Sequence, residues 1–148
     1  MKLPNGSDRS QLFIPATSLF FYLTACALPC VEFDTPAGHE IWFGYSILLR
    51  GWMAIVIGQL AWMANPLWLG SMALFIYQRW RLSIWLSLFG LFLALSTFLI
   101  FSQRGVRDTE MGVLPLQRIR IGVYVWILSQ LVLFFGAIYA RKRAHITA

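Results

Sequence analysis

The side chains best suited to chemistry gather in the segment that begins at Cys26. Cys26 and Cys30 lie one helical turn apart, and His39 and Glu40 follow shortly after. Thiols, imidazole and carboxylate are the groups that hold zinc in proteins, so a metal site is one interpretation. A disulfide between the two cysteines is another, and it needs the helix to distort around Pro29. Because a buried cysteine is commonly only a small hydrophobic residue, the sequence predicts no metal and no cofactor.

Charged residues near Arg50 form the second candidate group. Arg50 follows a short acidic segment, residues 32–40, and precedes a long uncharged run. It is expected to pair with an acid of that segment or with a lipid phosphate. One interpretation is an arginine that anchors a helix at the membrane surface; the other is a site for an anionic headgroup or a partner's acid. The candidate lipid or partner contacts are Arg50, Glu32, Asp34, Glu40, Arg118 and Arg120.

Missing residue types argue against an enzyme. His39 and His145 both lie outside the apolar runs, and no Asp or Glu is expected at mid-membrane depth. A haem ligand pair within the membrane and a proton relay are therefore excluded, and no phosphate-binding glycine loop or zinc spacing occurs. A lipid-modifying enzyme is the one exception kept open.

Composition places the chain in the polytopic membrane class. Hydrophobic residues make up 59% of its 148 residues and charged residues only 12%. The net charge of +6 comes from short basic clusters at the ends of apolar runs, which does not indicate nucleic-acid binding. From Trp52 to Gln78 there are 27 residues without a charge, and a membrane helix needs about 20.

These runs predict an all-α membrane protein, a single domain with four transmembrane helices in an antiparallel bundle. The expected spans cover residues 13–31, 51–78, 82–102 and 121–140, and residues 41–49 form a short interfacial segment before the second span. An alternative treats the start of the chain as a secretory signal ending at Leu23–Cys26, which would make Cys26 a lipidated residue. The strongly apolar chain after Cys26 argues against this alternative.

Small and polar residues recur on single helix faces, which predicts where the spans pack. In the second span they step by three and four residues from Gly51 to Asn65, and small residues let membrane helices approach closely. Pro66 removes a helical hydrogen bond to the carbonyl of Trp62, so a kink is expected there. The predicted packing residues are Gly51, Ala54, Gly58, Gln59, Ala61, Asn65, Pro66, Gly90, Ser129 and Gln130.

Basic residues predict the orientation. With both termini cytoplasmic, seven lysines and arginines lie inside and five lie outside, which follows the positive-inside rule. The predicted topology is therefore multi-pass, with the amino and carboxyl termini inside.

One stretch also carries a resemblance. The segment GWMAIVIGQLAWMANP, with ACALPC before it and GVYVWILS in the last span, resembles a pattern in small polytopic bacterial membrane proteins of unassigned function. The resemblance implies a bacterial inner membrane and no activity.

The function expected from these features is binding. A small membrane protein with packing faces and no relay residues fits an accessory subunit of a membrane complex, or a protector of the immunity-protein type. The alternative is a homo-oligomeric channel or small-solute transporter. The expected partners are membrane lipids and either another membrane protein or further copies of the chain.

Overall fold

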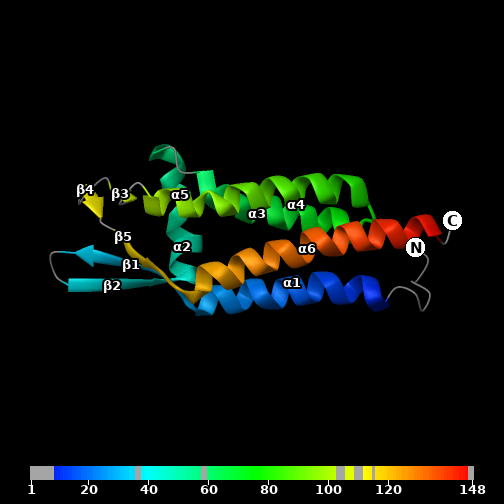
Figure 1. Cartoon of the computed structure of the whole chain (residues 1–148), viewed down its shortest axis with the longest axis horizontal. Coiled ribbons are helices and arrows are strands. Elements are labelled where there is room, and N and C mark those ends of the chain that lie inside the picture. Colours follow the sequence, from blue (N-terminus) through cyan, green and yellow to red (C-terminus); the bar gives the residue numbers. More distant parts are fainter. Residues whose placement is uncertain are drawn as a thin grey trace.

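The computed structural model describes residues 9–35, 38–57, 60–102, 106–108, 112–114 and 116–146. Helices run along most of the molecule, and a small sheet lies at one end (Figure 1). In chain order the elements are α1 (Arg9–Ala27), β1 (Pro29–Thr35), β2 (Gly38–Phe43), α2 (Gly44–Arg50), η1 (Gly51–Ile57), η2 (Leu60–Met63), α3 (Ala64–Ile76), α4 (Trp80–Leu95), α5 (Thr97–Ser102), β3 (Val106–Asp108), β4 (Gly112–Leu114), β5 (Leu116–Ile119) and α6 (Ile121–Ile146).

Helices α1, α3, α4 and α6 lie side by side and form the body of the molecule, here called the helical layer (Figure 1). Helix α1 packs along α6, and α4 packs against both α6 and α3. The chain turns sharply from α3 into α4 at Gln78, which has a positive φ of 58°. The amino terminus of α1 and the carboxyl terminus of α6 both lie at the end opposite the sheet (Figure 1).

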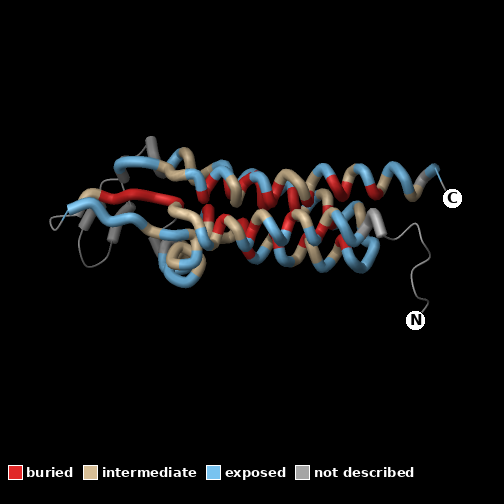
Figure 2. The backbone as a smooth tube through the Cα atoms, turned by 90° about the horizontal axis from the view of Figure 1, so that it is seen from below, coloured by how far each residue is buried: buried red, intermediate tan, exposed pale blue. Residues whose placement is uncertain are grey.

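The sheet has the strand order β2-β1-β5, and both pairs are antiparallel. In the central strand, Glu32 lies opposite Ile41 of β2 and Arg118 of β5. Residues 30–33 of β1 are buried, whereas β2 is exposed along nearly its whole length (Figure 2). A second, two-stranded sheet pairs β3 with β4.

The expected all-α bundle of four membrane-spanning helices is wrong. Residues 29–35 and 38–43 form two antiparallel strands, and residues 116–119 add the third strand of their sheet. Of the helices that the structure describes, two are long and apolar enough to cross a membrane, over Trp80–Leu99 and Ile121–Ala144. Two other apolar helical stretches, Leu12–Ala27 and Leu60–Ile76, are shorter.

The physical reason lies in the strand-forming residues around the acidic segment. The run from Cys30 to Phe33 contains β-branched and aromatic residues, which favour a pleated strand once neighbours cover it. The first expected span therefore stops at Ala27. The expected interfacial segment, 41–49, is divided between strand β2 and helix α2.

The expected second span is also interrupted. Residues 51–78 are divided among the 3-10 helices η1 and η2 and the α-helix α3. Pro66 lies in the first turn of α3, where its missing N–H costs little, so it follows the break instead of kinking a continuous helix. The side-chain nitrogen Nδ2 of Asn65 donates a hydrogen bond of 3.1 Å to the carbonyl of Trp62. This carbonyl is the group that Pro66 leaves without a helical donor.

Candidate functional site

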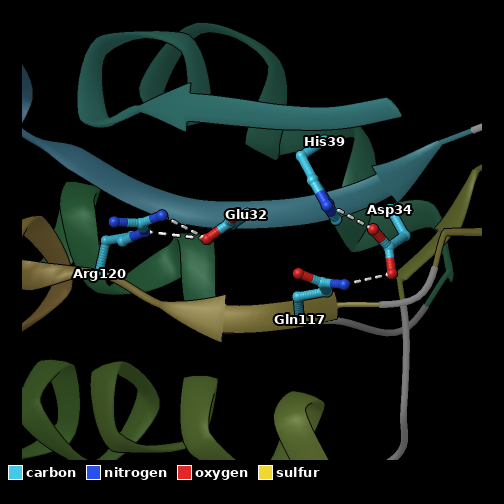
Figure 3. Close-up of polar contacts among 5 residues, drawn as sticks. All are labelled: Glu32, Asp34, His39, Gln117 and Arg120. Atoms are coloured by element: carbon cyan, nitrogen blue, oxygen red, sulfur yellow. Dashed lines mark hydrogen bonds and ion pairs between the residues drawn. The ribbon is translucent and has the colours of Figure 1, made fainter. Parts of the chain in front are cut away.

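The sheet end holds a partly buried ion pair between strand β1 and the residue that follows strand β5. Glu32 of β1 is only 8% exposed, and its carboxylate accepts hydrogen bonds from Arg120, the residue between β5 and α6 (Figure 3). The Nε of Arg120 lies 3.0 Å from Oε2 of Glu32, and its Nη2 lies 2.5 Å from the same oxygen. The backbone N–H of Arg120 also donates to the carbonyl of Cys30 at 2.8 Å. This pair therefore ties the start of α6 to the central strand.

A second, exposed group of polar contacts surrounds Asp34 near the tip of the hairpin (Figure 3). Nδ1 of His39 lies 2.6 Å from Oδ1 of Asp34, and Nε2 of Gln117 donates to its Oδ2 at 2.5 Å. Asp34 thus joins β2 and β5 across β1. Both His39 and Asp34 are open to solvent, so the group orders the sheet at a water-exposed surface.

Arg50 does not take part in these pairs. Its guanidinium carbon lies 5.9 Å from the centre of the Trp42 ring, a cation–π contact between α2 and β2. Among the ion pairs of the described residues, the acids of the 32–40 segment contact His39 and Arg120 instead. The expected pairing of Arg50 with those acids is therefore not observed. Glu40 and Arg118, the other charged candidates, are exposed on β2 and β5.

The two cysteines are separate free thiols. Burial, with a smaller contribution from Cys26, raises the pKa of the Cys30 thiol to about 12. A neutral buried thiol is a poor nucleophile and a poor metal ligand. Among the described residues, no group of three or more His, Cys, Asp or Glu side chains could hold a metal ion.

Asn65 is the centre of a polar network inside the helical layer. Its Oδ1 accepts hydrogen bonds from the Tyr22 hydroxyl at 3.1 Å and from Nε1 of Trp126 at 3.0 Å. Asn65 itself is 8% exposed. One asparagine therefore connects α1, α3 and α6. Sequence reasoning found Asn65 through its spacing but missed Tyr22 and Trp126, because aromatic residues in an apolar run give no sign of their partner.

Serine side chains make further buried bonds between helices. Oγ of Ser18 donates to the carbonyl of Ser129 at 2.8 Å and accepts from Nε1 of Trp68 at 3.0 Å. Ser71 and Ser83 exchange hydroxyl-to-carbonyl hydrogen bonds of 2.9 Å in both directions between α3 and α4. These serines extend the hydrogen-bonded interior along the helical layer.

The predicted packing residues occupy several different environments. Ala61, Asn65, Gly90, Ser129 and Gln130 are buried. A Cβ at Gly90 would lie 3.3 Å from the Cβ of Leu67 and 3.5 Å from Oε1 of Gln130, so this glycine permits close approach of α3 and α6 to α4.

Other predicted packing residues lie nearer the surface or outside the described part. A Cβ on the half-buried Gly51 would come within 2.6 Å of the Trp62 ring. Pro66 is exposed. Gly58, Gln59 and the side chain of Ala54 lie outside the described residues.

The outer surface of the helical layer is apolar. Trp85 is 70% exposed and Phe92 is 68% exposed on α4, although Ser83 and Ser87 of the same helix are completely buried. The same contrast holds on α1, where Phe13 is exposed and Ser18 is buried. A water-soluble protein places such residues the other way round. The helices thus bury several hydroxyl and amide groups among apolar core residues such as Trp68, Phe75 and Leu133, and they expose many other large apolar side chains on their outer faces.

Comparisons with models of known protein families, with curated proteins and with solved structures find no match to this chain.

Proposed function

We propose that this chain is an integral membrane protein of the bacterial inner membrane that acts by binding another membrane protein. The observation that carries the proposal is the apolar outer surface of the helical layer, where exposed Trp, Phe and Leu side chains cover an interior that contains buried serines and amides. Lipid tails solvate such an apolar surface, whereas buried polar groups need partners within the protein. In this proposal α4 and α6 cross the bilayer, and the exposed faces of α1 and α3 also contact lipid.

The distribution of charge supports an orientation with both termini in the cytoplasm. Five cations lie at the end of the helical layer that carries the termini: Arg79, Arg81, Arg141, Lys142 and Arg143. The acids of the described residues, Glu32, Asp34, Glu40 and Asp108, belong to the strands at the opposite end. Positive residues mark the cytoplasmic side of a membrane protein. The sheet then faces the periplasm.

The sheet end is the surface that we assign to partner binding. Strand β2 forms one edge of the sheet, and an edge strand offers backbone groups for pairing with another chain. Ile41 and Phe43 of β2 and the adjacent Tyr45 are exposed beside this edge. An exposed strand edge bordered by apolar side chains fits a protein partner, as expected of an accessory subunit or an immunity-type protector.

Photo-crosslinking in intact cells tests this function. A benzophenone amino acid replaces Phe43 at the sheet edge, and in a matched control it replaces Trp85 on the outer face of α4. We expect the first position to give a discrete crosslink to a different protein and the control to give only lipid adducts. A crosslink from position 43 to a second copy of the chain would favour the homo-oligomeric channel. Equal protein crosslinking from both positions would contradict binding at the sheet end.

A further inference from the structure

A hollow of about 570 Å³ lies at the end of the helical layer opposite the sheet. It is open to the surface and is formed where the turn between α3 and α4 meets the last turns of α6. Its lining residues are Gln78, Arg79, Trp80, Arg81, Leu82, Arg141 and Ala144. The hollow therefore combines three guanidinium groups with apolar side chains.

None of these three arginines forms a salt bridge with an acid among the described residues. The acids that the structure describes all belong to the sheet end, at the other end of the helical layer. Arg79 and Arg81 are exposed, and Arg141 is half-buried. Within the described part of the chain, no acid neutralises these three positive charges. Because a guanidinium presents a planar fork of donors, it suits the oxygens of a phosphate.

The turn that forms one wall of the hollow is fixed by the backbone. Gln78 has a φ of 58°, a conformation that most residues other than glycine avoid. The N–H of Arg79 donates to the carbonyl of Leu74 at 2.9 Å, and the N–H of Gln78 donates to that of Phe75 at 3.0 Å. These bonds end α3 with a left-handed cap and start α4 within three residues. Arg79 and Arg81 are thereby held beside the end of α6.

We infer that the hollow binds the phosphate headgroup of an anionic phospholipid. This inference rests on the proposed membrane location, which puts the arginines at the level of the cytoplasmic lipid phosphates. Basic hollows between helices on the cytoplasmic side are typical sites for such headgroups. In this arrangement Arg79, Arg81 and Arg141 contact the phosphate oxygens. Trp80 and Leu82 contact the part of the acyl chains that is next to the headgroup. A free phosphate ion offers the same oxygens but leaves the apolar lining exposed.

Native mass spectrometry of the detergent-solubilised full chain, titrated with cardiolipin or phosphatidylcholine, tests the inference. We expect cardiolipin to bind at least tenfold more tightly. The Arg79→Gln/Arg141→Gln variant should lose about tenfold in cardiolipin affinity, because each cation that contacts the headgroup contributes several-fold to its binding. Lys142→Gln is the matched control: it removes a neighbouring charge on α6 that does not line the hollow. Its affinity should change less than twofold.

Several outcomes would overturn the inference. Equal losses in the double variant and in Lys142→Gln would show diffuse surface charge instead of a site. Displacement of cardiolipin by millimolar inorganic phosphate would assign the hollow to the free ion. If the double variant fails to fold by circular dichroism, Arg79→Lys/Arg141→Lys keeps both charges, and unchanged cardiolipin affinity in that variant would contradict recognition by guanidinium groups. A chain that stays monodisperse without detergent would instead contradict the proposed function.

Discussion

The interior of the helical layer and the sheet end both join distant segments through polar contacts, but they use different chemistry. Inside the helical layer the groups are neutral: an asparagine, serines, a tyrosine hydroxyl and indole N–H groups. At the sheet end they are charged or titratable, with Glu32 held by Arg120 and Asp34 beside His39.

This difference follows from access to water. An uncompensated charge is costly in a low-dielectric interior, whereas a neutral amide needs only hydrogen-bond partners. The side chain of Arg120 is 39% exposed, so one member of the ion pair between Glu32 and Arg120 reaches solvent. The contrast fits the proposal that the sheet end lies in water and the helical layer in lipid.

The largest effect is expected from breaking the neutral network. Asn65→Leu keeps the approximate volume but removes the acceptor of Tyr22 and Trp126. The buried Tyr22 hydroxyl and the partly buried Trp126 N–H then lose their acceptor, so the free energy of unfolding should fall by about 2–3 kcal/mol. The measurement is unfolding by SDS in mixed micelles. Tyr22→Phe removes a single bond and should cost about 0.6 kcal/mol; equal losses in the two variants would contradict a network centred on Asn65.

A smaller effect is expected at the buried end of the sheet. Glu32→Gln keeps the shape but removes the charge that faces Arg120. Because the arginine can turn toward water, the loss should be about 1–2 kcal/mol, below that for a fully buried pair. The same SDS titration measures it. A loss as large as that of Asn65→Leu would mean that Arg120 is not able to reach solvent.

The exposed tip of the hairpin should contribute least. Asp34→Asn removes a charge beside His39 and retains an acceptor for Gln117. Exposed pairs contribute little, so the change should stay below about 0.5 kcal/mol. Hydrogen exchange of the β2 amides provides a second measurement, with slightly faster exchange expected in the variant. A destabilisation above that of Glu32→Gln would reverse the proposed order of the two contacts.

Alkylation of Cys30 tests whether strand β1 is closed to water in the folded protein. Burial raises the pKa of its thiol to about 12, so the reactive thiolate is scarce at pH 8 and becomes abundant only near that pKa. Iodoacetamide should therefore leave Cys30 unmodified at pH 8 in the folded protein and label it fully in SDS. Peptide mass spectrometry measures the labelling. Rapid modification in the folded state would show that β1 opens to water.

The apolar runs predicted two of the helices well, because each is uniform and bounded by arginines. The expected spans 82–102 and 121–140 overlap the two candidate crossing helices. The sheet was not predicted, since its central strand is a short run between a helix and a breaker. Its pairing with β5 joins residues more than 80 positions apart, and nothing local in the sequence specifies that contact.

The candidate site shows the same limit. The sequence identified Glu32, Asp34 and Arg120 as charged residues outside the apolar runs but gave no information on which would pair. Arg50 was expected to contact an acid, and the structure places its guanidinium carbon 5.9 Å from the centre of the Trp42 ring instead. Spacing indicated Asn65 as a packing residue. Its two aromatic hydrogen-bond donors, Tyr22 and Trp126, lie on other helices, 43 and 61 positions away in the sequence.

Spin-label accessibility tests most directly the claim that the helical layer lies in lipid and the sheet end in water. Labels are placed at position 92 on α4 and at position 39 on β2, in a chain with both native cysteines replaced by alanine and reconstituted into phospholipid vesicles. We expect oxygen to relax the label at position 92 more strongly than a water-soluble nickel chelate does, and we expect the reverse order at position 39. Stronger relaxation by the nickel chelate at both positions would contradict that claim.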